Sequence, residues 1–352
     1  MNLWGGLRLI GIAGVAFVMA SCSGGTGRPQ ESGGTGASAF VKLQGAGASF
    51  PAPLYTKWFR QYTKAHDNVQ IDYQSVGSGS GVRSFIDKTV DFGASDAAMT
   101  PDEIAKVDVG AVLLPMTAGS IVLAYNLQGV DNLKLSRDAY TGIFLGKVTK
   151  WNDPVIAQAN PGVNLPDSPI NVVVRADSSG TTFVFTTHLS AISPAFKKSP
   201  GANKMPNWPV GTRSKGNEGV TASIKTTPGS IGYIEYGYAS TQNIPMAQLE
   251  NKSGKYITPT IQSAQATLAN AKLPENLIGW FPDPDGADSY PIVTYTWMMF
   301  YKKYDNPQKA KVLKDVITFC LDEGQKESQE LGYIPLPANV IAKDKAAMAK
   351  IQ

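Results

Sequence analysis

The chain alternates between short apolar runs and longer segments in which apolar residues recur every three or four positions. The short runs have the length of buried strands, and the recurrence is that of helices with one buried face. Strands are therefore predicted at residues 69–73, 112–114, 121–125, 170–174, 231–233 and 292–301. Strands that alternate with helices in this way indicate an α/β architecture, with largely parallel sheets and helices on their faces.

One strand-to-helix junction carries residues suited to an anion. Arg175-Ala-Asp-Ser-Ser-Gly-Thr181 follows the strand at 170–174 and precedes a helical pattern that begins near Gly180. The first N–H groups of a helix have no partner inside it, and the peptide dipoles leave about half a positive charge there, so an oxyanion satisfies both. Arg175 adds a planar guanidinium that can bind two oxygens of one tetrahedral ion. Taken alone, an Arg near Ser-Gly-Thr is more often an ordinary capped turn.

Three further junctions repeat this chemistry. Gly45-Ala-Gly-Ala-Ser49-Phe50-Pro51 opens a helix with prolines in its first turn, and Ser49 is predicted to be a hydroxyl at that helix start. Ser78 is predicted at another start, in Gly77-Ser-Gly-Ser-Gly81. Phe92-Gly-Ala-Ser-Asp96 ends a strand and precedes Thr100-Pro-Asp-Glu103, a capping box. Ligands in α/β sheets bind outside the carboxyl ends of the strands, where all four junctions fall.

Length and charge narrow the class of protein. The chain has 352 residues, of which 43% are hydrophobic and 17% charged, so it is long enough for two cores. It has 32 basic and 28 acidic residues; residues 1–21 contain one of these, Arg8, so 31 and 28 remain beyond them, a net charge of +3. This balance, without a basic run interleaved with aromatic residues, argues against nucleic acid as a partner.

The first residues have the pattern of an export signal. An apolar run at 9–20 follows Arg8 and ends in Met19-Ala-Ser-Cys22; it is too short to span a bilayer. Its end resembles the lipobox of bacterial lipoproteins, in which small residues precede a cysteine that becomes lipid-bearing. Residues 1–21 are therefore predicted to be a lipoprotein signal peptide, Cys22 the lipidated residue and 22–39 a flexible tether, with an ordinary signal cleaved nearby as the alternative. Cys320 then has no partner and is predicted to be buried on a helix face.

A hydroxyl-rich anion site is also compatible with an enzyme. A secreted phosphatase or serine hydrolase would use Ser49 or Ser179 as its nucleophile. The two histidines, His66 and His188, lie late in helical patterns, however, and no Gly-x-Ser-x-Gly elbow, metal-ligand spacing, dinucleotide fingerprint or P-loop is present. We therefore expect a binding protein with no catalytic residue, no cofactor and no metal. Aromatic clusters at 233–238 and 295–301 are interpreted as sheet and core residues rather than a sugar platform.

Five segments together resemble a known family. Residues 45–58, 73–97, 142–151, 175–187 and 229–239 are similar to the substrate-binding protein of the bacterial high-affinity phosphate ABC transporter, of Pst type. The resemblance extends from about Leu43 to the C-terminal region. It implies phosphate ligands at Ser49, Phe50, Ser78, Asp96, Arg175, Ser179, Gly180 and Thr181. Ser49 departs from the family pattern, since many members have threonine there.

The resemblance also implies a fold and partners. The fold is α/β and periplasmic-binding-protein-like (type II), a two-domain Venus flytrap with two hinge crossings. Residues 40–117 and 290–352 would form one lobe and 118–289 the other, with crossings near 117–120 and 289–292. The implied partners are inorganic phosphate and the permease and ATPase subunits of the importer. A lipid anchor would hold the protein at the outer face of the bacterial cytoplasmic membrane or in the periplasm.

Asp96 is the residue expected to select among anions. Phosphate near neutral pH keeps at least one proton and sulfate keeps none, so a carboxylate acceptor favours phosphate and rejects sulfate. A helix-approach cap is the alternative role for Asp96, and a binder of another tetrahedral oxyanion is the alternative function. Asp177 is expected to orient and partly neutralise the Arg175 guanidinium, although an exposed turn carboxylate is nearly as common in such a position.

Overall fold

The structure is a computed structural model, and it describes residues 39–271 and 273–352. The predicted signal peptide, Cys22 and the tether up to Ser38 lie outside the described residues. Within the described ranges, no helix combines the length and the apolar character that crossing a membrane requires.

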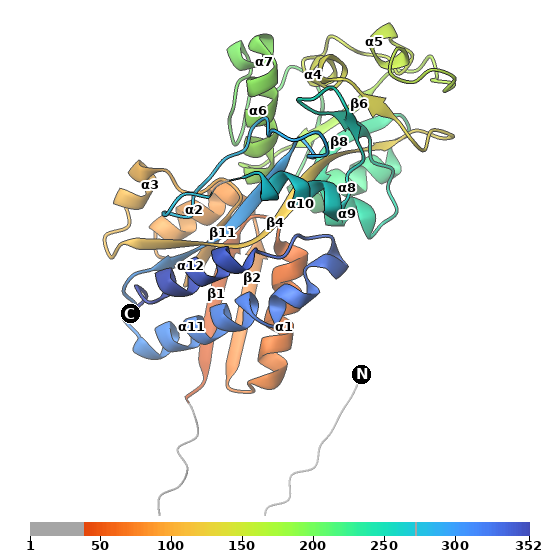
Figure 1. Cartoon of the computed structure of the whole chain (residues 1–352). Helices are drawn as coiled ribbons and strands as arrows, with labels where there is room; N and C mark the ends of the chain where they lie inside the picture. Colours follow the sequence, from red (N-terminus) through yellow and green to blue (C-terminus); the bar gives the residue numbers. More distant parts are fainter. Residues whose placement is uncertain (1–38, 272) are drawn as a thin grey trace, which may run out of the picture. The chain divides into compact units, whose positions relative to one another are not determined.

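The described chain is built around one large sheet (Figure 1). Its strand order is β2-β1-β3-β11-β4-β8-β6-β7, so strands distant in the sequence lie next to each other at its centre. The strands are β1 (Val41–Gly47), β2 (Val69–Ser75), β3 (Phe92–Ser95), β4 (Ala111–Asn126), β6 (Asn171–Arg175), β7 (Thr212–Ser214), β8 (Ser230–Glu235) and β11 (Val293–Tyr301). A second sheet, β10-β9-β5, consists of Tyr256–Ile257, Gln248–Glu250 and Lys134–Leu135.

The sheet has parallel flanks and an antiparallel centre. On one flank β1 pairs in parallel with β2 and β3, and on the other β6 pairs in parallel with β7 and β8. In the centre β11 is antiparallel to both β3 and β4, and β4 is antiparallel to β8. The predicted parallel pairing is thus correct for the flanks only. The final strand β11 returns from the far end of the chain and inserts between β3 and β4, and β4 itself runs antiparallel to β8.

Strand β4 connects the two flanks. Two strands were predicted here, at 112–114 and 121–125, but β4 is one strand of 16 residues, and its central residues, Thr117 and Ser120 among them, are buried. It pairs with β11 from Ala111 to Ser120 and with β8 from Ile121 to Asn126. The register against β11 shifts once: Pro115 pairs with Trp297 and Thr117 with Thr296, so Met116 is skipped.

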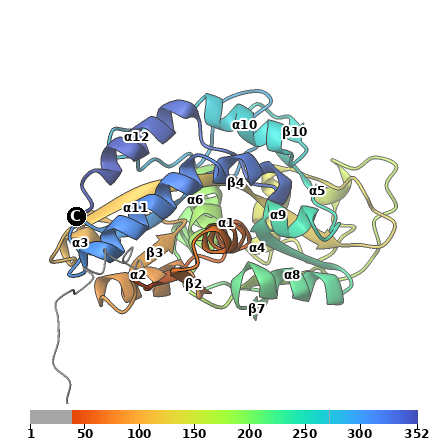
Figure 2. The same ribbon diagram turned by 90° about the horizontal axis from the view of Figure 1, so that it is seen from below.

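Helices pack against both flanks. Figure 1 shows α1 (Ala52–Ala65) and α11 (Pro307–Leu321) beside β2 and β1, and α8 (Gly216–Thr226) and α9 (Tyr236–Ser240) beside β8. The buried face of α1 is formed by Leu54, Tyr55, Trp58, Phe59 and Tyr62, as its helical spacing predicts. Figure 2 shows α12 (Ala338–Met348) alongside α11. Cys320 is buried on α11, as predicted.

The remaining helices are short or connect the strands. They are α2 (Ser78–Ile86), α3 (Pro101–Ala105), α4 (Arg137–Phe144), α5 (Pro154–Ala157), α6 (Gly180–Ile192), α7 (Pro194–Lys198) and α10 (Ile261–Ala269), with 3-10 turns at Gly324–Glu327 and Gln329–Leu331. The predicted capping box is present at α3: Thr100 Oγ1 accepts from Glu103 N, and the Glu103 carboxylate accepts from Thr100 N. Helix α2 lies so close to the sheet that a Cβ at Gly81 would overlap the backbone of β1 and β3.

Candidate anion-binding site

The four strand-to-helix junctions supply a cluster of buried polar side chains. Arg175 is the last residue of β6, Ser78 the first of α2, and Asp96 follows β3 directly. Ser179 is the N-cap of α6, and Gly180 and Thr181 form its first turn. The exposed fraction is at most 2% for Ser49, Ser78, Asp96, Arg175, Ser179 and Thr181. Polar groups buried to this extent need defined partners.

Thr181 joins two of the junctions. Its Oγ1 donates to Asp96 Oδ2 at 3.3 Å and accepts from Arg175 Nη1 at 3.4 Å. One hydroxyl therefore separates a guanidinium from a carboxylate that comes from a distant part of the sheet. Arg175, Thr181 and Asp96 thus place a buried cation close to a buried hydrogen-bond acceptor. This arrangement suits a ligand that is an anion and also carries a proton.

Gly180 lets α6 approach the other flank of the site. A Cβ at this position would overlap Ser78 Oγ and the Asp96 side chain. Asp96 N in turn donates to Ser78 Oγ at 3.2 Å. The start of α6, where the first N–H groups have no partner one turn back in the helix, therefore lies directly against Ser78 and Asp96. The structure thus brings together residues of three of the four predicted junctions.

Asp177 fixes the Arg175 guanidinium. Arg175 Nε donates to Asp177 Oδ1 at 2.9 Å and Nη2 donates to Oδ2 at 2.5 Å, while Gly216 N also donates to Oδ1 at 3.0 Å. Burial raises the pKa of Asp177, but the hydrogen bonds and charge of Arg175 outweigh burial and leave that pKa below its ordinary value. The carboxylate is therefore an ionised partner of Arg175 rather than an exposed turn residue. It occupies one edge of the guanidinium and leaves Nη1 toward Thr181.

The pKa of Asp96 lies near neutral pH. Its Oδ1 accepts from Thr296 Oγ1 at 2.9 Å, and Oδ2 accepts from Thr181. Burial raises the pKa of Asp96 to about 7, against the opposing effects of the Thr296 hydrogen bond and the Arg175 charge. At neutral pH this carboxyl can therefore both accept a hydrogen bond and hold a proton.

Three site hydroxyls accept hydrogen bonds from N–H groups. Ser49 Oγ accepts from Asn217 N at 3.0 Å and from Asn217 Nδ2 at 2.9 Å. Ser179 Oγ accepts from Thr182 N at 3.0 Å, and Ser78 Oγ accepts from Asp96 N. A hydroxyl has one proton and two lone pairs, so a hydroxyl whose lone pairs are used by N–H groups has its O–H left to donate. Donors are what the oxygens of an oxyanion require.

Ser49 is held differently from the prediction, and Phe50 is held next to it. The N-cap of α1 is Pro51, so Ser49 is not its capping hydroxyl; the Ser49 hydroxyl instead accepts from the first turn of α8. Tyr238 Oη donates to Ser49 O and Tyr333 Oη donates to Phe50 O, both at 2.7 Å. The Phe50 ring is fully buried and packs edge-on against Tyr333, so its main-chain N–H is the group that Phe50 can offer to an anion.

Two residues of this cluster were missed from the sequence. Asn217, fully buried in the first turn of α8, contacts both Ser49 and Thr181. Its junction has the same strand-to-helix form as the other four, but β7 before it is three residues, Thr-Arg-Ser, without an apolar run. Thr296 lies within β11, and nothing in the local pattern of that strand sets it apart.

The histidines have partners outside this cluster. His188 is buried in α6, with Nε2 2.9 Å from Tyr140 Oη and Nδ1 2.6 Å from Pro282 O. Burial lowers the pKa of His188 to about 4. His66 ends α1 and stacks on Tyr62. Among the residues that the structure describes, no group of three or more His, Cys, Asp or Glu side chains is arranged to hold a metal ion.

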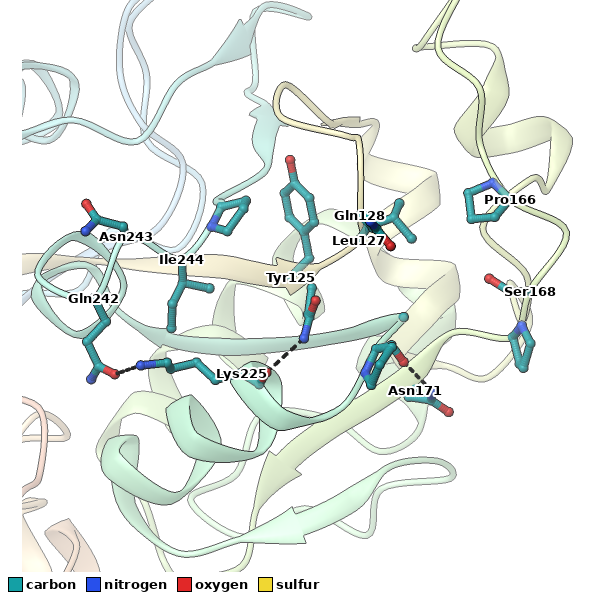
Figure 3. A pocket seen from close by; sticks show the side chains of 15 residues that line it. Tyr125, Leu127, Gln128, Pro166, Ser168, Asn171, Lys225, Gln242, Asn243 and Ile244 are labelled. Carbon is teal, nitrogen blue, oxygen red and sulfur yellow. Dashed lines mark hydrogen bonds between the residues drawn. The ribbon is translucent and has the colours of Figure 1, made fainter.

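A separate hollow of about 810 Å³ lies where β4 ends and where β6 and β8 begin (Figure 3). Several of its polar side chains have partners: Lys225 Nζ donates to Gln242 Oε1 at 3.0 Å, and Asn171 Nδ2 donates to Pro228 O at 2.9 Å. The lining shares no residue with the anion cluster. The hollow is therefore not an extension of that cluster.

Comparisons with known proteins identify relatives along nearly the whole chain. A family model described as a PBP superfamily domain matches residues 28–323. The chain is 40% identical over 309 residues to phosphate-binding protein PstS of Pasteurella multocida, which covers 86% of this chain and 89% of that protein. It is 38% identical over 347 residues to phosphate-binding protein PstS of Methanocaldococcus jannaschii, with 92% and 89% covered.

Solved structures give a matching fold. A phosphate-binding protein from Stenotrophomonas maltophilia superposes with a TM-score of 0.71 at 21% identity, covering 87% of this chain and 93% of that one. A high affinity periplasmic phosphate-binding protein bound with phosphate superposes with a TM-score of 0.70 at 19% identity, with 87% and 93% covered. At these identities the likeness is one of fold.

Proposed function

The chain belongs to the PBP superfamily and, within it, to the phosphate-binding proteins named PstS, and on this basis we propose that it captures inorganic phosphate and delivers it to an ABC importer. In this role it is a substrate-binding protein that acts outside the cytoplasm, and its partners are the permease and ATPase subunits of the importer. The expected α/β fold of periplasmic-binding-protein type agrees with this membership.

One observation carries the proposal: Asp96 and Arg175 both bind Thr181 Oγ1 inside a fully buried cluster. Arg175 supplies the positive charge that an anion needs. Asp96 supplies an acceptor for the proton that phosphate retains near neutral pH. Sulfate has no such proton, so its oxygens would face the carboxylate with lone pairs only, and a buried mismatch of this kind is strongly rejected.

The other ligands in the proposal are donors. The phosphate oxygens would be bound by three kinds of donor. These are Arg175 Nη1, the hydroxyls of Ser49, Ser78, Ser179 and Thr181, and the main-chain N–H groups of Phe50, Gly180 and Thr181. The support for this set is the burial of its members and the orientation of their hydroxyls. Asp177 would not contact the phosphate itself but would hold the Arg175 guanidinium in position.

The site would be divided between two lobes that close on the anion. In this proposal the first lobe is 40–117 with 290–352, and the second lobe is 118–289. The change of partner in β4 supports it, since β4 leaves β11 at Ser120 and joins β8 at Ile121, next to the crossing proposed at 117–120. Contacts between the proposed lobes flank the site: Gly79 N donates to Ser178 O at 2.9 Å, and Lys204 Nζ lies 3.3 Å from Glu103 Oε1.

A lipid anchor would keep the protein at its transporter. Residues 1–21 would be removed as a signal peptide, Cys22 would carry the lipid, and the segment 22–39 would act as a tether. The support is the sequence pattern alone. The expected result is that the wild-type protein, expressed with its signal in a bacterium, fractionates with membranes and the Cys22→Ser variant does not. Equal distribution of the two would contradict the anchor.

The function is tested by calorimetric titration of the chain starting at Ser23. Any bound anion is first removed by unfolding and refolding, and phosphate and sulfate are then titrated at neutral pH. We expect one-to-one binding of phosphate and no response to sulfate. Equal binding of both anions would indicate a general oxyanion binder, and binding of neither would return the phosphatase interpretation to consideration.

A further inference from the structure

Asn217 makes several hydrogen bonds to residues of the anion cluster that lie outside its own helix. It is fully buried in the first turn of α8. Its N and Nδ2 donate to Ser49 Oγ, Nδ2 also donates to Thr181 Oγ1 at 3.3 Å, and Oδ1 accepts from Glu235 N at 2.9 Å. A single side chain thus connects two hydroxyls of the cluster to strand β8.

The Glu235 main chain fixes which way the Asn217 amide points. Glu235 N–H is a donor, so the amide atom that faces it has to be the oxygen. Nδ2 is therefore directed at the hydroxyls of Ser49 and Thr181. Thr221 Oγ1 donates to Asn217 O at 2.7 Å and holds the main chain of the same turn.

This orientation determines where the hydroxyl protons lie. Ser49 Oγ accepts two N–H groups from Asn217, which uses both of its lone pairs, so the O–H is directed away from Asn217. Thr181 Oγ1 accepts from Asn217 Nδ2 and from Arg175 Nη1, so its O–H is directed toward Asp96 Oδ2. Without Nδ2, each hydroxyl regains a free lone pair and can rotate.

We propose that Asn217 is a positioning residue for anion binding, which orders the Ser49 hydroxyl as a donor to the anion and keeps the Thr181 hydroxyl directed at Asp96. The proposal rests on the proposed function and deepens it. In the two-lobe arrangement Ser49 belongs to the first lobe and Asn217 to the second. Ser49 therefore acquires its donor orientation when the lobes meet, and specificity for an acceptor-rich ligand depends on closure.

A double-mutant cycle tests the proposal. Phosphate affinity is measured by calorimetry for the wild type, Asn217→Ala, Ser49→Ala and the double variant. Loss of one ordered donor to a charged ligand weakens binding ~10- to 100-fold, so each single variant is expected to show a loss in that range. Because Asn217 acts largely through Ser49, adding Asn217→Ala to Ser49→Ala should cost at most about threefold more.

Asn160 provides the matched control. It is a buried asparagine whose amide also bonds main-chain groups, Lys134 N, Lys134 O and Ile156 O, at a place away from the cluster. Asn160→Ala should lower thermal stability and leave phosphate affinity within about twofold of the wild type. If it weakens phosphate binding as much as Asn217→Ala does, the effect is one of stability and the positioning role is overturned.

A second variant keeps the shape of the side chain. Asn217→Asp replaces the donating nitrogen by an oxygen that accepts the Ser49 proton, so the hydroxyl turns away from the anion. The ratio of its phosphate Kd to that of the wild type should exceed that of Asn217→Ala at pH 8 and fall as acid protonates the new carboxyl. A ratio that stays constant between pH 8 and pH 5 would contradict the proposal.

The outcomes separate this proposal from the function on which it rests. If the wild type does not bind phosphate, the proposed function fails and the role of Asn217 fails with it. If the wild type binds phosphate while Asn217→Ala binds it equally well, or the losses in the cycle add in full, only the positioning role is overturned.

Discussion

Thr296 and Asp96 are 200 residues apart in the sequence, yet Thr296 Oγ1 donates to Asp96 Oδ1 at 2.9 Å. The bond ties the last strand of the sheet, β11, to the end of β3. It stabilises the ionised carboxylate against burial and keeps Oδ1 occupied, so Oδ2 is the oxygen that faces Thr181. In the proposed site, Thr296 thus influences which Asp96 oxygen is directed toward Thr181.

Thr296→Val should raise the pKa of Asp96. The substitution keeps the shape of the side chain and removes a hydrogen bond that favours the charged form. At pH 7 less Asp96 is then ionised, and the phosphate affinity of the variant relative to the wild type should fall and recover as the pH increases. Thr294→Val is the control, since Thr294 is equally buried on β11 and donates to Tyr295 O. Identical pH profiles for the two variants would refute the role of Thr296.

Asp96→Asn should reduce discrimination between phosphate and sulfate. The amide can donate as well as accept, so it no longer repels a fully deprotonated oxyanion. We expect the ratio of sulfate Kd to phosphate Kd to fall by at least about tenfold, measured by competition at neutral pH. Unchanged selectivity would show that the carboxylate does not read the proton.

Gly180→Ala should weaken anion binding without unfolding the protein. The added methyl would overlap Ser78 Oγ and Asp96, which pushes the start of α6 away from them. A shift of this kind lengthens several contacts at once, and we expect phosphate affinity to fall by about tenfold or more. Gly219→Ala is the control, because a Cβ there meets its nearest atoms at 3.6 Å, an ordinary contact. A similar loss in both variants would indicate a general effect on helices.

Asp344 should make stability depend on pH. It is fully buried on α12, neither carboxyl oxygen has a hydrogen-bond partner among residues 39–271 and 273–352, and burial raises its pKa to about 8 from the ordinary 3.8. The folded protein therefore holds a proton that the unfolded chain releases above about pH 4, so this contribution to stability is lost as the pH rises from about 4 to about 8. Asp96, with its pKa raised to about 7, acts in the same direction.

The variant Asp344→Asn isolates this effect. It cannot ionise, so at pH 8.5 it should be more stable than the wild type by an amount on the order of a few kcal/mol, and the difference should shrink toward pH 5. Urea unfolding at the two pH values measures it. A pH-independent difference would mean that Asp344 is not the group that titrates.

The sequence predicts those parts of the site that depend on local signals. Ser78 at a helix start, the Thr100 capping box and Gly180 at the start of α6 follow from glycine, proline and hydroxyl residues near one another in the chain, and the structure confirms these local features. Asp96 and Arg175 are also buried, as expected for residues of a binding site. Which of these residues bind an anion remains a prediction.

The rest depends on contacts between distant segments. Asn217 joins Ser49 across 168 residues, and Thr296 acts from a strand whose pattern predicts only that it is buried. The antiparallel centre of the sheet arises because β11 returns to insert between β3 and β4, which no local periodicity records. The sequence does not predict the fifth junction, between β7 and α8, because the polar and mostly exposed strand β7 lacks an apolar run.

The skipped residue in β4 has a mechanical consequence. Met116 lies where the register against β11 shifts, and β4 exchanges β11 for β8 further along, between Ser120 and Ile121. An extra residue of this kind loosens the ladder and increases local twist. In the two-lobe proposal, a change in twist at this point would let the two flanks rotate relative to each other. We therefore expect the twist of β4 near Met116 to change when the lobes close on the anion and to change back when the anion leaves.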